Sequence, residues 1–166
     1  LLLGKLNDDI DVTTSAEPEI IVKLVTGWAD AIWDQGAKFG TIGIRKNSQI
    51  IEITTHRSEN YVTNSRKPSV QFSNLIEDDL SRRDFTVNSM AIKLPDWELI
   101  DPFGGQVDLD RKVLRTPLDP EVSFSDDHFR MLRAARFMAG YQLFPGIDLI
   151  AAVEKLRDRI SIVSKE

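Results

Sequence analysis

The chain has 166 residues, of which 42% are hydrophobic and 28% are charged, so it has enough apolar material for a folded domain of ordinary size. It contains no cysteine, which excludes disulfide bonds, thiolate metal sites and cysteine nucleophiles. The net charge of −5 argues against indiscriminate nucleic-acid binding, and no apolar run approaches the roughly 20 residues that a membrane span needs. We therefore expect a globular protein of a reducing, cytoplasmic compartment, with no membrane partner.

The first informative stretch is the β-prone run at 9–13, which carries acidic residues at alternate positions. Alternate side chains of a strand lie on the same face, so Asp9, Asp11 and Thr13 share a face. Two neighbouring carboxylates repel each other, and a hard divalent cation with oxygen ligands relieves that repulsion. A solvated strand end is the alternative interpretation. An EF-hand loop is excluded, because Thr14 stands where that loop needs glycine.

Helical spacing of apolar residues follows at 20–32, with Ser15 as the expected cap and Gly36 as the expected end. Two strand-like stretches come next, at 39–45 and 50–55, separated by a polar turn. The order of elements therefore begins as mixed α and β.

Within the second of these strands, Glu52 lies on the face opposite its isoleucine neighbours. If this strand pairs with the one at 9–13, three acids converge on one face. Residues 58–68 are polar and predict a loop, 75–83 predict a short acidic helix, and 90–94 predict a strand.

From Val122 onward the pattern becomes helical. Ser125 is the expected cap of one helix, Gly140 is its expected end, and a second helix is expected over 147–160. A boundary near residue 116 therefore separates a mixed region from an all-helical one.

Four segments resemble, in the right order, the motifs of the class II tRNA nucleotidyltransferases, the family of CCA-adding enzymes and bacterial poly(A) polymerases. They are 9–19 (DIDVTTSAEPE), 82–91 (RRDFTVNSMA), 101–105 (DPFGG) and 126–137 (DDHFRMLRAARF, with Asp126 where glutamate is usual). The resemblance implies an α+β nucleotidyltransferase head over 1–116, with a small mixed or antiparallel sheet flanked by helices. The start of an all-α neck would follow over 117–166.

The family pattern also includes elements that this sequence of 166 residues does not contain. A glycine-rich element would precede residue 1, and a further helical motif, body and tail would follow residue 166. We therefore expect the chain to be an interior piece of a longer protein, which puts the activity of the piece by itself in doubt.

By the same resemblance, Asp9 and Asp11 would hold Mg²⁺, Glu52 would complete the catalytic carboxylates, and Arg82 and Arg83 would bind the incoming triphosphate. Arginine suits this role because its planar fork bonds two phosphate oxygens and keeps its charge. The remaining positions that the resemblance assigns to nucleotide binding are Gly4, Lys5, Asp84, Asn88, Asp127, Arg130, Arg133 and Arg136.

Asp127 and Arg130 are three residues apart, and are therefore neighbours on one helix face. Cytosine and adenine both present an amino donor beside a ring-nitrogen acceptor, which an Asp acceptor and an Arg donor satisfy together. Uracil and guanine offer the reverse order and would leave buried polar groups unpaired, at roughly 1–3 kcal/mol each. An ordinary surface ion pair is the alternative interpretation of these two residues.

The function implied is addition of CMP and AMP, from CTP and ATP, to the 3′ end of tRNA. Enzymes that add only CC or only A remain alternatives, as does a non-catalytic RNA-binding fragment. A bacterial poly(A) polymerase is disfavoured, because residues 38–43 lack the basic stretch of those enzymes. The oligomeric state stays open.

Overall fold

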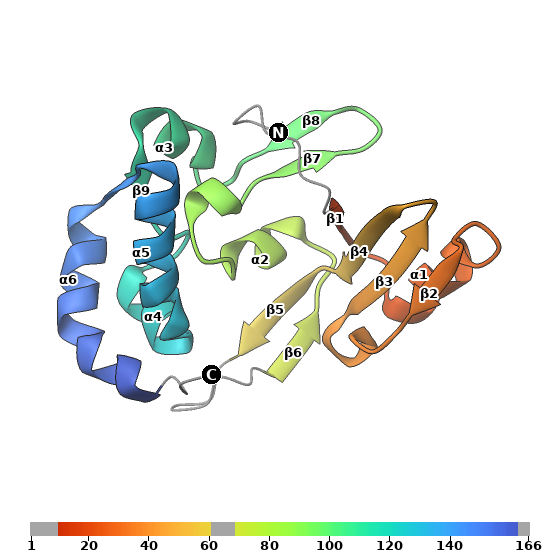
Figure 1. Ribbon diagram of the computed structural model, residues 1–166, viewed down its shortest axis with the longest axis horizontal. Helices are drawn as coiled ribbons and strands as arrows, with labels where there is room; N and C mark the ends of the chain where they lie inside the picture. Colours follow the sequence, from red (N-terminus) through yellow and green to blue (C-terminus); the bar gives the residue numbers. More distant parts are fainter. Residues whose placement is uncertain (1–9, 61–68, 163–166) are drawn as a thin grey trace. The chain divides into compact units, whose positions relative to one another are not determined.

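The structure is a computed structural model that describes residues 10–60 and 69–162 (Figure 1). The chain divides into two compact units, the first of residues 1–60 and 70–79 and the second of 61–69 and 80–166. The boundary expected near residue 116 falls inside the second unit, and the division into head and neck stays a prediction. No helix in the described residues is long and apolar enough to cross a membrane.

A four-stranded mixed sheet forms the centre of the first unit. Its strands are β1 (Ile10–Thr14), β2 (Ala31–Trp33), β3 (Thr41–Lys46) and β4 (Gln49–Thr55), in the order β1-β4-β3-β2. β1 is parallel to β4, whereas the β4–β3 and β3–β2 pairs are antiparallel. The expected neighbourhood of the two acidic strands is therefore confirmed.

One face of this sheet is apolar and packs against α1 (Pro18–Val25). Ile42 and Ile44 of β3 and Ile21 of α1 are at most 3% exposed and form its core. Burying these β-branched side chains fixes the register of the strands, because a slip of one residue would turn them to the other face. The same alternation leaves Asp11 and Glu52 on the open face.

The helix expected over 20–32 is shorter than predicted. α1 ends at Val25, Gly27 has a left-handed φ of 85°, and residues 31–33 pair with β3 as a strand. Ser15 is not its cap either, since the N-cap residue is Glu17. The spacing of apolar residues predicted a longer helix because a strand of only three residues is too short to show the alternation of side chains that identifies a strand.

The start of the next strand also differs from the expectation. The short 3₁₀ turn η1 (Ala37–Phe39) includes the first residue of the expected strand, and Gly40, with φ of 88°, ends that turn. β3 therefore begins at Thr41. Beyond β4, β5 (Arg57–Asn60) pairs with β6 (Ser69–Phe72), so the expected loop at 58–68 begins as a strand.

The helix α2 (Ile76–Ser81) contains the point at which the two units divide. The elements that follow are η2 (Thr86–Asn88), β7 (Ala91–Lys93), β8 (Glu98–Ile100), α3 (Gly105–Arg111), β9 (Val113–Leu114), α4 (Pro120–Asp126), α5 (Phe129–Tyr141), β10 (Phe144–Pro145), α6 (Ile147–Leu156) and η3 (Arg157–Ile162). In the second unit, Phe85, Phe124 and Leu114 are fully buried at the centre of a core that α5 and α6 complete.

The helix expected between Ser125 and Gly140 begins only at Phe129, as α5, and a separate helix, α4, precedes it. Asp119 caps α4 by accepting hydrogen bonds from the backbone N–H groups of Glu121 and Val122. Ser125 therefore lies in the last turn of α4 and is not a cap. Gly140 does not stop the next helix, because α5 continues to Tyr141 and ends where Gln142 takes a left-handed conformation.

The turn at 101–105 holds η2 against α3. Asp101 accepts hydrogen bonds from the N–H groups of Gly105 (2.6 Å) and Gln106 (2.9 Å), which caps α3. Gly104 has a left-handed φ of 73°. A Cβ at Gly105 would lie 2.1 Å from the carbonyl oxygen of Thr86, so only glycine lets the two segments approach this closely.

Replacing Gly105 by alanine is therefore expected to lower the free energy of unfolding by about 3 kcal/mol, because the added methyl group overlaps backbone that cannot move easily. The matched control is Gly140→Ala in α5, where nothing lies within 4 Å of the new Cβ. That change should stabilise the protein by roughly 0.5–1 kcal/mol. Denaturant unfolding of both variants measures this, and equal effects would contradict the close approach.

Candidate active site

Asp11 of β1 and Glu52 of β4 are register partners in a parallel pair of strands. Neighbouring strands lie about 4.8 Å apart and partners at the same register share a face, so the two carboxylates lie side by side. Both side chains are exposed. The predicted position of Glu52 beside the acidic strand is confirmed for Asp11, whereas Asp9 lies outside the described residues, as do Gly4 and Lys5.

The chemistry of this pair suits a hard divalent cation, which takes carboxylate oxygen ligands. Within residues 10–60 and 69–162, no group of three or more acidic or histidine side chains is placed to hold a metal ion. The two carboxylates that the register of β1 and β4 brings together are those of Asp11 and Glu52.

The same row of the sheet continues through Gly43 of β3, the partner of Glu52, to Trp33 of β2. The indole of Trp33 lies over Gly43, because a Cβ there would be 1.9 Å from its ring nitrogen. An aromatic ring therefore flanks the acidic pair on its face. Sequence reasoning missed Trp33, since it placed this stretch at the end of a helix.

The segment Arg82-Arg83-Asp84 follows α2 and enters the core of the second unit at Phe85. Asp84 is 7% exposed, and its Oδ1 accepts hydrogen bonds from the Phe85 N–H (2.9 Å) and from Nδ2 of Asn88 (3.1 Å). Asn88 thus closes the turn η2 on the carboxylate. Both predicted nucleotide ligands have structural partners.

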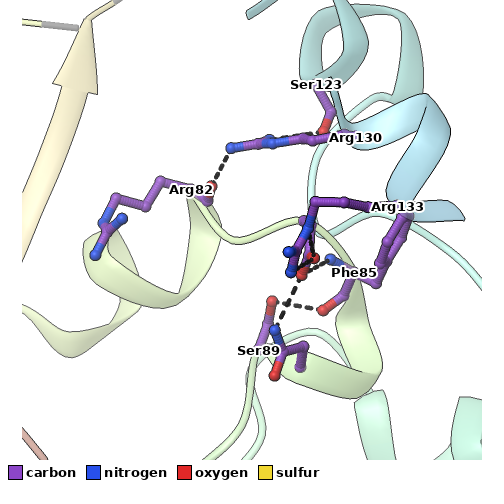
Figure 2. Close-up of polar contacts among 8 residues, drawn as sticks. Arg82, Phe85, Ser89, Ser123, Arg130 and Arg133 are labelled. Atoms are coloured by element: carbon purple, nitrogen blue, oxygen red, sulfur yellow. Dashed lines mark hydrogen bonds and ion pairs between the residues drawn. The ribbon is translucent and has the colours of Figure 1, made fainter. Parts of the chain in front are cut away.

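Helix α5 supplies two arginines to this segment (Figure 2). Arg133 donates from Nε (2.8 Å) and Nη2 (2.5 Å) to Oδ2 of Asp84. Arg130 is 8% exposed, and donates from Nη1 to Oγ of Ser123 (2.7 Å) and from Nη2 to the carbonyl oxygen of Arg82. In Figure 2 the side chain of Arg82 extends away from Arg130.

Asp127 lies at the junction of α4 and α5, and its Oδ1 accepts a hydrogen bond from the N–H of Phe129 (3.0 Å). Arg130 follows in the first turn of α5. The guanidinium of Arg130 has N–H donors beyond the two that bond Ser123 and Arg82. The base-reading role of this pair stays a prediction, as does the nucleotide-binding role of Arg136, which is exposed on α5.

The structure adds buried polar side chains that sequence reasoning did not single out. Asp108 accepts hydrogen bonds from Oγ1 of Thr86 (2.6 Å) and Nε of Arg115 (2.9 Å), which ties η2 to α3. His128 is 3% exposed, with Nδ1 2.5 Å from the carbonyl oxygen of Phe124. This contact requires a proton on Nδ1, because a carbonyl oxygen can only accept.

A small mixed sheet with a helix on its apolar face and paired carboxylates on its open face is the nucleotidyltransferase head fold. The chain belongs to the poly A polymerase head domain family, whose model matches residues 1–115.

Among known proteins, the chain is 40% identical over 161 residues to the CCA-adding enzyme of Bacillus subtilis (strain 168). The matched region covers 95% of this chain and 39% of that protein. Two solved structures are similar. The CCA-adding enzyme of Bacillus stearothermophilus in complex with CTP has a TM-score of 0.85 and 32% identity, covering 98% of this chain and 38% of that one. A tRNA nucleotidyltransferase complexed with a primer tRNA and an incoming ATP analog has a TM-score of 0.74 and 30% identity, covering 95% and 44%. The chain thus spans about two fifths of the length of these relatives.

Proposed function

We propose that the protein adds CMP and AMP, from CTP and ATP, to the 3′ end of tRNA without a nucleic-acid template. The observation that carries this proposal is the register pairing of Asp11 with Glu52 on the open face of the sheet. The names of its relatives support it, since they include CCA-adding enzymes and complexes with CTP, an ATP analog and tRNA. The family implies a divalent metal ion, and we propose Mg²⁺.

In this proposal Asp11, Glu52 and Asp9 hold the metal. When bound, Mg²⁺ would lower the pKa of the attacking 3′-hydroxyl and neutralise charge on the α-phosphate. The guanidinium groups of Arg82 and Arg83 bind the triphosphate, whose pyrophosphate leaves. Asp127 and Arg130 select the base by the order of donor and acceptor on its pairing edge. We further propose that the protein acts in the cytoplasm.

The test is incubation of the protein with tRNA lacking CCA and with each labelled nucleoside triphosphate in turn. Incorporation of C, followed by A when CTP and ATP are both present, is the expected result. Addition of C alone or of A alone would indicate a partial enzyme, and long A tails would indicate a poly(A) polymerase. Retention of tRNA without incorporation of any nucleotide would indicate a binding fragment and contradict the proposal.

A further inference from the structure

An aromatic ring and a cation stand on the open face of the sheet, beside the two carboxylates. Trp33 ends the row of register partners that begins with Asp11 and Glu52, so its side chain rises from the same face as theirs. Arg45 follows Gly43 by two residues along β3, which places it on this face too. Trp33 is half-buried and Arg45 is exposed.

Gly43 brings the ring of Trp33 toward the carboxylates. Glycine has no side chain, and the indole takes the place of one, since a Cβ at Gly43 would lie 1.9 Å from Nε1 and 2.3 Å from Cε2 of Trp33. One strand spacing, about 4.8 Å, separates Gly43 from Glu52. The ring therefore stands one strand away from the acidic pair, with no side chain of β3 between them.

The indole of Trp33 offers contacts that the protein itself does not use. In the part of the chain that the structure describes, its Nε1–H is neither hydrogen-bonded nor among the buried polar atoms without a partner. The described side chains that form the apolar core lie on the opposite face of the sheet, and Trp33 is not packed among them. A tryptophan placed in this way presents a ring and a donor to a molecule that binds over the sheet.

A ring beside a positive charge is suited to single-stranded nucleic acid. Every base has a π-face, so stacking on an aromatic side chain tolerates any base. The proposed function needs this tolerance, because the protein must accept tRNA that ends in different bases as CMP and AMP are added. The terminal nucleoside of the tRNA also needs a binding residue of its own. The predicted ligands of the incoming nucleotide belong to the second unit and are Arg82, Arg83, Asp127 and Arg130.

We propose that Trp33 binds the 3′-terminal nucleoside of the tRNA, with the terminal base stacked on the indole. This inference rests on the proposed function for the identity of the RNA. The 3′-hydroxyl of that nucleoside is then directed toward Asp11 and Glu52, one strand from the ring. The charge of Arg45 on the same face attracts the phosphates of the strand. The first unit therefore binds the attacking strand as well as the metal.

The experiment places the fluorescent adenine analogue 2-aminopurine at the 3′ end of a tRNA that lacks CCA. Its emission falls when it stacks on another ring, and it is followed as saturating protein binds the tRNA in Mg²⁺ without nucleoside triphosphate. Wild-type protein should quench the emission, and Trp33→Leu should lose most of this quenching. In the incorporation assay, Trp33→Leu should raise the KM for tRNA about tenfold, through loss of one stacked base, and leave the KM for CTP unchanged.

Three further variants separate stacking from a structural role. Trp33→Phe keeps an aromatic face and should retain part of the quenching. Gly43→Ala keeps the tryptophan but fills the place of its ring, and should reduce quenching as Trp33→Leu does. Trp28→Leu is the matched control, because Trp28 lies in the turn after α1, is 50% exposed and belongs to no strand. It should change neither quenching nor either KM. Denaturant unfolding establishes the conditions in which all variants are folded, and they are compared there.

Quenching that survives in Trp33→Leu, or that Trp28→Leu loses equally, would overturn the inference. If Trp33→Leu does not fold, unchanged quenching in Gly43→Ala would overturn it instead. A raised KM for CTP with an unchanged KM for tRNA would also do so, because it would place the ring against the incoming nucleotide.

The wild-type protein separates this inference from the proposed function. Wild-type protein that quenches the terminal base but never extends the tRNA would contradict the proposed function alone. Wild-type protein that extends the tRNA without quenching its terminal base would overturn the inference alone. Wild-type protein that binds no tRNA would overturn both.

Discussion

Asp11→Asn is expected to lower nucleotide incorporation about 1000-fold, because it removes a charged ligand from a metal that contributes several kcal/mol to the transition state. It should leave the free energy of unfolding unchanged or slightly higher in metal-free buffer. The reason is the register pairing with Glu52, since like charges directly opposite each other on neighbouring strands destabilise a sheet. Single-turnover incorporation across a Mg²⁺ titration, beside denaturant unfolding, measures both effects.

Glu52→Gln should likewise lower nucleotide incorporation while leaving the free energy of unfolding unchanged or slightly higher, because Glu52 is the register partner of Asp11. Glu98→Gln is the control: it removes an exposed strand carboxylate of β8, whose contact with Lys93 is loose at 3.8 Å. It should change neither quantity appreciably. An Asp11→Asn protein that incorporates nucleotide within tenfold of wild type at saturating Mg²⁺ would remove Asp11 from the catalytic set.

Asp127→Asn is expected to shift base preference toward UTP and GTP by about tenfold relative to CTP and ATP. The N–H of Phe129 bonds Oδ1 of Asp127, so an asparagine that keeps its oxygen there carries its amide nitrogen in place of Oδ2. An acceptor then becomes a donor, which is the group that the pairing-edge carbonyl oxygen of uracil or guanine needs at that position. Competition between CTP and UTP in the incorporation assay gives the ratio directly.

Asp127→Ala is the informative companion, because it removes the acceptor and supplies no donor. It should reduce the use of all four nucleotides without favouring UTP. If Asp127→Asn retains the wild-type ratio, the side chain serves only to bond the first turn of α5 and the base is read elsewhere.

Strand alternation was sufficient to predict the acidic face. Asp11 and Glu52 were expected on the same side of their strands, and burial of Ile42 and Ile44 enforces that side. The strand β2 could not be predicted in this way. Its three residues form a strand because they pair with β3, and they show no strand pattern of their own in the sequence.

The hydrogen bonds of the α5 arginines could not be predicted from spacing. The spacing of Arg130 and Arg133 places them on one face of a helix, but a long side chain reaches several alternative partners. Which partner it takes depends on the fold around it, here the carbonyl oxygen of Arg82 and the carboxylate of Asp84. The candidate nucleotide-binding residues were thus named by resemblance, whereas their mutual contacts required the structure.

Because the indole of Trp33 lies over Gly43, the residues that each of these two positions can accept depend on the residue at the other. Any side chain at position 43 must displace the ring, and any small residue at position 33 leaves a gap beside Glu52. A relative that carries a larger residue at one position is therefore expected to carry a smaller one at the other. A substitution at either position by itself changes the shape of the surface beside Asp11 and Glu52. Variation at this pair would therefore alter the candidate active site without replacing either carboxylate.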